Sequence, residues 1–84
     1  MRILICEDSV LLREGLVRLL EHSGHQVSAA LPDTTDLIST LQTDMPDLAI
    51  LDVRLPPTYT DEGIRAALQI RHTYPDLPLL VLSQ

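Results

Sequence analysis

The sequence predicts an α/β fold built on a parallel sheet. Short apolar runs alternate along the chain with longer segments in which apolar residues recur at helical spacing, a pattern typical of βα units. Several of these runs contain no polar residue, as expected of strands that helices cover on both faces. With 84 residues, 45% of them apolar, the chain has the length and composition of one small globular domain. We expect four strands and three helices.

The first half of the chain begins with a predicted strand at residues 3–6, followed by a helix that Ser9 can cap. Four leucines of this helix recur at spacings of three and four and therefore share one face. They are Leu12, Leu16, Leu19 and Leu20. Gly24 is suited to the left-handed conformation that ends a helix. A weaker strand is predicted at residues 27–31, and Pro32 closes it.

The second half begins with a short predicted helix that either Asp33 or Thr34 can cap. Its apolar residues are Leu37, Ile38 and Leu41. Met45-Pro46 ends it, because the residue before a proline is biased away from helical conformation. A strand follows at residues 48–51, and Asp52 stands at its end.

A proline-containing loop leads to a third predicted helix, which starts near Asp61 and stops before Pro75. At helical spacing, this helix presents a face of four residues. They are Ile64, Ala67, Leu68 and Arg71. The last predicted strand covers residues 79–82 and runs into Ser83.

Charge and cysteine content exclude several classes of protein. A net charge of −6 leaves too few cations to displace the counterions of a nucleic acid, so we expect no direct nucleic-acid contact by this chain. Cys6 is the single cysteine and lies in an apolar run, which predicts a core residue in a reducing compartment. No leader precedes the first strand, and the apolar runs are far shorter than the ~20 residues of a membrane-spanning helix. We expect a cytoplasmic protein with no membrane contact.

Polar groups stand at the ends of three predicted strands. Glu7 and Asp8 follow the first strand, Asp52 ends the third, and Ser83 follows the fourth. Open parallel sheets bind ligands outside the carboxyl ends of their strands, so three carboxylates converge there if the first and third strands are neighbours. Converging carboxylates repel one another unless a cation neutralises them. Hard oxygen ligands of this kind suit Mg²⁺.

This combination predicts phosphoryl transfer. The reaction needs positioning and charge neutralisation more than covalent chemistry from the protein, and a carboxylate beside a bound metal can be the nucleophile. Asp52, at the tip of a strand, is the expected acceptor. Glu7 and Asp8 are expected to hold the metal. The Ser83 hydroxyl is expected to donate a hydrogen bond to a phosphoryl oxygen.

Three segments together resemble the receiver domains of two-component response regulators in order and spacing. They are residues 5–8 (Ile-Cys-Glu-Asp), residues 50–56 (Ile-Leu-Asp-Val-Arg-Leu-Pro) and residues 81–83 (Val-Leu-Ser). The resemblance covers the whole chain and implies a flavodoxin-like, doubly wound parallel sheet with strand order 2-1-3-4. It also implies that the backbone carbonyl of Arg54 is a further metal ligand and that Ser83 is the switch hydroxyl. The phosphoryl donor that it implies is the phosphohistidine of a histidine kinase.

The loop between the third strand and the third helix is longer than the simplest receiver loop. The segment 52–63 resembles receivers of the NarL/LuxR-type branch, whose complete proteins carry a helix-turn-helix output domain. The resemblance therefore implies a parent protein that regulates transcription by binding DNA. No output domain is present in this chain.

The sequence departs from the family at its C-terminal end. Receivers have a fifth strand with a lysine that pairs with the phosphoryl group, whereas all six basic residues here are arginine. We therefore expect residues 1–84 to be the N-terminal two-thirds of a receiver domain, without the fourth and fifth helices, the fifth strand and the switch lysine. Strand 79–82 would then be an open edge, and we expect self-association through it or through the uncovered sheet face.

The leading hypothesis is a phosphoacceptor signalling module, and not an enzyme beyond self-phosphorylation and autodephosphorylation. One alternative is a receiver-like scaffold that binds partners without phosphorylation, although the intact Glu7, Asp8 and Asp52 count against it. Another is a phosphatase of the haloacid-dehalogenase type. That chemistry needs a second carboxylate two residues after the nucleophile, and Arg54 stands there.

Overall fold

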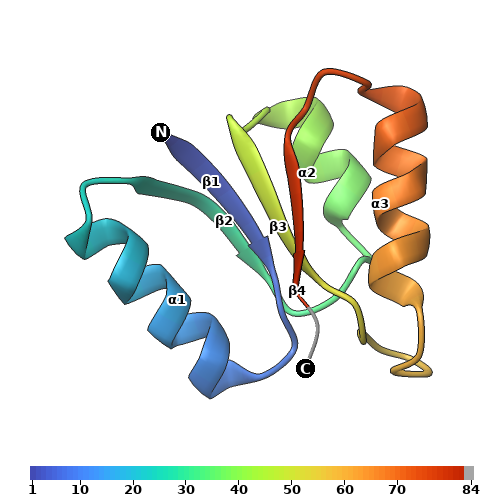
Figure 1. Ribbon diagram of the computed structural model, residues 1–84, viewed down its shortest axis with the longest axis horizontal. Helices are drawn as coiled ribbons and strands as arrows, with labels where there is room; N and C mark the ends of the chain where they lie inside the picture. Colours follow the sequence, from blue (N-terminus) through green and yellow to red (C-terminus); the bar gives the residue numbers. More distant parts are fainter. Residues whose placement is uncertain (83–84) are drawn as a thin grey trace.

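The computed structural model describes residues 1–82 and forms one parallel sheet with helices on both faces. Its strands are β1 (Arg2–Cys6), β2 (Gln26–Leu31), β3 (Leu48–Asp52) and β4 (Leu79–Leu82). Its helices are α1 (Val10–His22), α2 (Leu37–Thr43) and α3 (Glu62–Thr73) (Figure 1). The strand order is β2-β1-β3-β4, which confirms the predicted fold and order. Within residues 1–82, none of the helices has the length and apolar character needed to cross a membrane.

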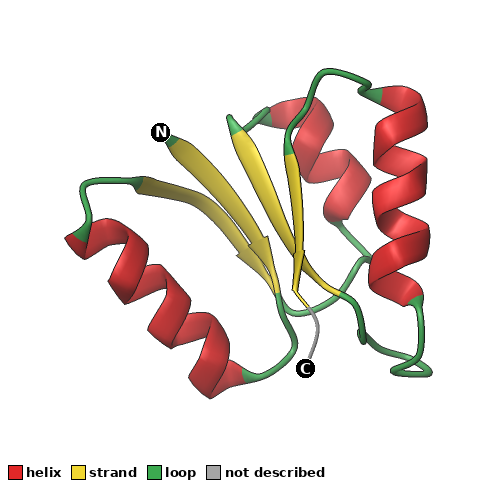
Figure 2. Cartoon of the chain, viewed as in Figure 1, coloured by secondary structure: helices red, strands yellow, loops and turns green. Residues whose placement is uncertain are grey.

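Two apolar layers hold the sheet between the helices. Helix α1 covers one face, and α2 with α3 covers the other (Figure 2). Because side chains alternate along a strand, Ile3 and Ile5 of β1 pack in the layer under α1. Leu4 and Cys6 pack in the opposite layer, with α2 and α3. All four are buried, so β1 is covered on both faces, as its unbroken apolar run predicts.

Helix α1 begins and ends as the sequence predicts, but the partly buried face that packs on the sheet is rotated. The Ser9 hydroxyl accepts a hydrogen bond from the amide of Leu12 (3.3 Å), and Gly24 has a φ of 91°. The face against the sheet consists of Leu16, Val17 and Leu20. Leu19 is exposed, so its assignment to one face with the other leucines is wrong. Val17 takes its place because a helix of 3.6 residues per turn brings residues 16, 17 and 20 to one side.

The start of α2 also differs from the expectation. Neither Asp33 nor Thr34 caps the helix, whose N-cap position is Asp36 without a side-chain hydrogen bond. The carboxylate of Asp33 instead accepts from the amide of Thr35 (2.9 Å), which closes a local turn after β2. This turn delays the helix until Leu37, and Leu37 and Leu41 are buried as expected.

Helix α3 packs through a different face from the one that its apolar spacing suggests. The buried residues are Gly63, Ala66 and Ile70. Gly63 has no side chain and that of Ala66 is small, which lets the helix approach β3 closely, and Ile70 fills the core beneath it. The face at Ile64 and Leu68 is exposed instead. Together with β4 it forms an apolar groove of about 340 Å³, whose lining residues are Ile64, Ala67, Leu68, Arg71, Leu79 and Val81.

Candidate functional site

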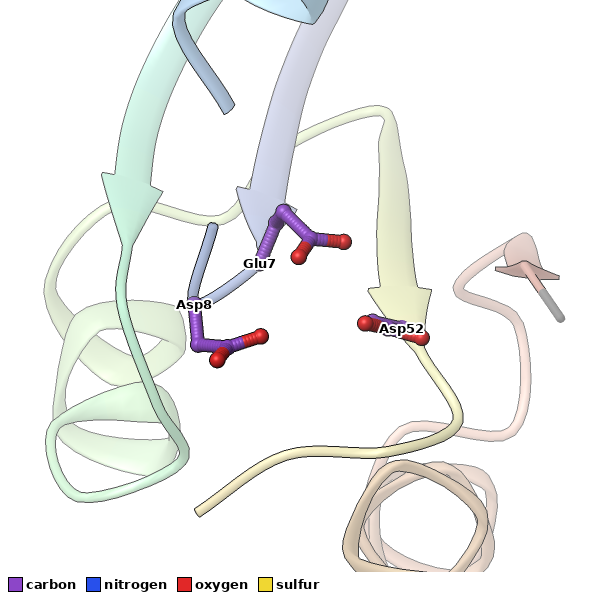
Figure 3. Close-up of side chains that lie close together, drawn as sticks. All are labelled: Glu7, Asp8 and Asp52. Carbon is purple, nitrogen blue, oxygen red and sulfur yellow. The ribbon is translucent and has the colours of Figure 1, made fainter. Parts of the chain in front are cut away.

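The predicted carboxylates meet at the carboxyl ends of two adjacent strands. Strands β1 and β3 run parallel with Cys6 opposite Leu51, so Glu7 and Asp52 follow the same level of the sheet. Glu7, Asp8 and Asp52 each offer a carboxylate oxygen, and these atoms all lie within 4.8 Å of one another. Figure 3 shows the three side chains directed into the space between the strand ends. The structure thus brings together the acidic residues that the sequence singles out.

Burial makes this acidic cluster electrostatically costly. Glu7 is 2% exposed and Asp52 is 6% exposed, whereas Asp8 is half-buried. Burial raises the pKa of Glu7, the negative charge of Asp52 and contacts with Asp52 and Asp8 raise it further, and the amide of Ser9 opposes the rise. Carboxylates held close together in this way can bind a hard divalent cation through their oxygens.

Backbone hydrogen bonds hold the cluster in place. The amide of Glu7 donates to the carbonyl of Leu31 on β2 (2.9 Å), and its carboxylate accepts from the amide of Ser9 (3.0 Å). On the other strand, Oδ1 of Asp52 accepts from the amide of Arg54 (3.3 Å). Both buried carboxylates are therefore oriented by the chain that directly follows them.

Gly63 is a site residue that the sequence analysis misses. Its amide donates to the carbonyl of Val53 (2.9 Å), which brings the first turn of α3 against the end of β3. A Cβ atom at this position would collide with the backbone carbonyl of Asp52 and would lie 2.8 Å from Cα of Val53. Glycine is therefore needed here for a close approach of two backbones. The available signal is a glycine in the first turn of a helix, where it has no propensity advantage.

The loop before α3 is tied to the helix by Glu62, a second residue that the sequence analysis does not single out. The Glu62 carboxylate accepts from the amides of Thr58 (2.8 Å) and Thr60 (3.1 Å) and from the Thr58 hydroxyl. These hydrogen bonds, with the Thr58 hydroxyl as the largest contribution, lower the pKa of Glu62 to about 2. Hydrogen bonds to Glu62 thus hold the loop that follows β3 in place at the start of α3.

Other residues named from the sequence have mixed outcomes. Arg54 lies on the exposed part of the loop, and the role of its carbonyl as a metal ligand stays a prediction. Ser83 lies outside the described residues. Cys6 is buried as predicted, donates to the carbonyl of Asp33 (3.1 Å) and has a pKa raised to about 12, chiefly by burial. A larger hollow of about 470 Å³ lies at the other end of the sheet, around Tyr74, and contains none of the predicted site residues.

Comparison with known proteins agrees with this geometry. Residues 3–84 match the family model of the response regulator receiver domain. The response regulator MprA of Mycobacterium avium is 37% identical over 83 residues, which are 99% of this chain and 35% of MprA. The virulence transcriptional regulatory protein PhoP of Salmonella typhimurium is 40% identical over 83 residues, again 99% of this chain and 35% of PhoP. The chain thus spans about a third of these curated relatives.

Solved structures of response regulators share the fold. The response regulator TrrA of Thermotoga maritima, solved in complex with Mg²⁺ and BeF, aligns with a TM-score of 0.86 and 27% identity over 98% of this chain and 68% of TrrA. The isolated receiver domain of RcsB from Salmonella enterica serovar Typhimurium aligns with a TM-score of 0.86 and 26% identity over 99% of this chain and 61% of that domain. The family match covers nearly all of residues 1–84, and the chain belongs to the receiver-domain family of two-component response regulators.

Proposed function

We propose that this chain accepts a phosphoryl group on Asp52 from the phosphohistidine of a histidine kinase. The observation that carries the proposal is the convergence of Glu7, Asp8 and Asp52 within 4.8 Å at the ends of β1 and β3. In the transfer, a carboxylate oxygen of Asp52 forms a bond to phosphorus while the bond from phosphorus to the imidazole nitrogen of the donor breaks. The imidazole leaves with the electron pair of that bond and takes up a proton.

The residues present fit Mg²⁺. Two nearly buried carboxylates and one half-buried carboxylate supply oxygen ligands, and the raised pKa of Glu7 records the cost of holding them together without a cation. Glu7, Asp8 and Asp52 would hold the ion, with the backbone carbonyl of Arg54 as a proposed fourth ligand. When bound, Mg²⁺ neutralises charge on the carboxylates and on the incoming phosphoryl oxygens. The hydroxyl of Ser83 is proposed to donate to the phosphoryl group.

The protein contributes orientation to this reaction. The amide of Arg54 donates to Oδ1 of Asp52, which fixes the rotation of the carboxylate at the tip of β3. The amide of Gly63 and the carboxylate of Glu62 hold the loop that follows. A nucleophile held in this way loses little conformational freedom on reaching the transition state.

Incubation with Mg²⁺ and acetyl phosphate tests the proposal. We expect a phosphoryl adduct, seen by intact-mass spectrometry, that Asp52→Asn abolishes. Asp76→Asn is the matched control, because Asp76 is exposed and lies in the loop before β4. An undiminished adduct in Asp52→Asn contradicts the proposal. So does the absence of any adduct in the complete gene product that contains this chain.

We further propose that the parent protein regulates transcription through a DNA-binding output domain. The relative PhoP is named a transcriptional regulatory protein, and this chain spans 35% of it, so the proposal concerns a region beyond residues 1–84. Assignment to the NarL/LuxR-type branch stays a prediction from the 52–63 loop. The sequence that follows Gln84 in the parent gene tests both: a strand ending in lysine and then a helix-turn-helix is expected.

We also propose that the isolated chain self-associates through β4 with a second copy of itself. The amide of Ala49 on β3 donates to the carbonyl of Pro78 (3.1 Å), and the amide of Val53, directly after β3, donates to the carbonyl of Leu82 (2.9 Å). By the alternation of a parallel ladder, the backbone groups of Leu79 and Val81 then face the open edge. Light scattering is expected to give a mass above 9.4 kDa that rises with concentration. A concentration-independent monomer mass contradicts this proposal.

A further inference from the structure

Arg13 of α1 reaches back to the segment that carries two of the three carboxylates. Its Nη1 atom donates to the backbone carbonyl of Glu7 (2.7 Å) and, at longer range, to that of Asp8 (3.4 Å). The side chain is half-buried. Within residues 1–82, the ion pairs between side chains are Arg2 with Asp44 and Arg65 with Asp61. The charge of Arg13 is thus directed at backbone carbonyls rather than at a carboxylate.

These contacts close a ring around the junction between β1 and α1. The carboxylate of Glu7 accepts from the amide of Ser9, and the carbonyl of Ser9 accepts from the amide of Arg13 (2.8 Å). The guanidinium of Arg13 then returns to the carbonyl of Glu7. Glu7 is therefore held through both its side chain and its main chain. The bond from Arg13 is charge-assisted, a class roughly twice as strong as a neutral hydrogen bond.

We propose that Arg13 is a positioning residue for the acidic cluster: it fixes the backbone of Glu7 and Asp8 so that their carboxylates stay directed toward Asp52. This inference rests on the proposed Mg²⁺ site. Arg13 itself touches neither the carboxylates nor, in the proposed reaction, the phosphoryl group. Its role is to fix the orientation of the groups that do.

A purely electrostatic role for Arg13 makes the opposite prediction. Its positive charge acts on the same region, since it partly offsets the rise in the pKa of Cys6 that burial and nearby carboxylates cause. Removal of a cation makes the cluster more negative, which by itself strengthens the attraction for Mg²⁺. Removal of a positioning contact lets the ligands move and weakens binding. The sign of the change in Mg²⁺ affinity therefore separates the two roles.

Isothermal titration with MgCl₂ of the 84-residue chain tests the inference. Arg13→Met keeps most of the aliphatic stem and removes the guanidinium. We expect its Kd for Mg²⁺ to rise about ten-fold, the lower end of the effect of removing groups that orient metal ligands. Arg18→Met is the matched control: it removes the same charge from an exposed position of the same helix, and we expect its Kd to change less than about two-fold.

Two further variants make each outcome decisive. Arg13→Lys keeps the charge but offers only a single point donor, so an intermediate Kd is expected. It also provides the test if Arg13→Met does not fold. An unchanged or lower Kd in the Arg13 variants, with or without a lower melting temperature, overturns the inference. Wild-type chain that binds no Mg²⁺ overturns the proposed function as well, whereas binding that Asp52→Asn removes and Arg13→Met leaves intact overturns the inference alone.

Discussion

The two edge strands of the sheet are built differently. β2 carries polar and small residues among its apolar ones (Gln-Val-Ser-Ala-Ala-Leu), and its register against β1 shifts between Ile3 and Leu4. β4 consists of four large apolar residues (Leu-Leu-Val-Leu), of which Leu80 is 48% and Val81 is 37% exposed. A bulged or irregular pairing is a common protection of a sheet edge, whereas apolar side chains along an edge favour association. β2 has the irregular pairing and few large apolar residues, and β4 as described has large apolar residues and a regular pairing with β3.

This difference teaches that an apolar run specifies a strand but not its place in the sheet. The run at 79–82 has the composition of β1 or β3, which have neighbours on both sides and helices on both faces. In the described chain it has one neighbouring strand, β3. Its composition is that of an interior strand, and its position is that of an edge.

The largest effect is expected when a leucine side chain is shortened to alanine, once on an interior strand and once on the β4 edge. Leu51 of β3 is fully buried, so Leu51→Ala is expected to lower the free energy of unfolding by about 2–5 kcal/mol. Leu80→Ala on β4 should cost less than about 1 kcal/mol, because half of the side chain is already exposed. Urea unfolding at low protein concentration measures both. Equal costs would show that β4 is covered in solution.

A lysine introduced on β4 or on β2 tests which of these two edge strands pairs with a second copy of the chain. Val81→Lys on β4 is expected to reduce the light-scattering mass toward the monomer, because a lysine opposes pairing at an edge. Ala30→Lys on β2 adds the same charge at another exposed edge position and should leave the association unchanged. Loss of association only in Ala30→Lys would assign the contact to β2.

We expect the shifted register of β2 to lower the free energy of unfolding slightly, through the hydroxyl of Ser28. In the described part of the chain, the hydroxyl of Ser28 is buried without a hydrogen-bond partner. Ser28→Ala is therefore expected to raise the free energy of unfolding by about 1 kcal/mol. Ser39→Ala, at an exposed serine whose hydroxyl bonds the carbonyl of Asp36, should give no such gain. A loss of stability in Ser28→Ala would contradict the assignment.

The smallest effect is expected where β2 ends, at Asp33. Hydrogen bonds from Thr35 hold the pKa of Asp33 below its ordinary value. A carboxyl whose pKa is lowered by folding stabilises the folded state above the pKa of the unfolded chain, about 3.9, and loses that contribution as the pH falls through the folded pKa. Urea midpoints measured from pH 5 downward should therefore fall more steeply for wild type than for Asp33→Asn. Parallel profiles would contradict this.

The sequence predicts the fold well because three of the four strands contain an uninterrupted apolar run and each connection contains a recognisable helix. The predicted strands at 3–6, 27–31, 48–51 and 79–82 are all present, and three of them are longer by one residue. The faces of α1 and α3 are predicted less well. Helical spacing marks two apolar faces on α3, and only the close approach permitted by Gly63 and Ala66 decides which one packs.

The acidic cluster is predictable for a related reason. Strand ends are readable from the sequence, and parallel pairing then brings Glu7, Asp8 and Asp52 together. Gly63 and Arg13 are not predictable in this way, because both act on backbone carbonyls. The location of a carbonyl depends on how the elements pack, and no side-chain motif marks it.

The contact of Gly63 with the carbonyl of Asp52 has a consequence for protein engineering. Exchange of the segment 53–62 for a loop from another receiver changes the path between these two residues but not their need to meet. A graft that shifts the glycine by one position along the chain would place a side chain against the backbone at the end of β3. That side chain would push α3 away from β3. In such loop exchanges, Asp52 and Gly63 should therefore both be kept, and insertions or deletions should be made only between these two residues.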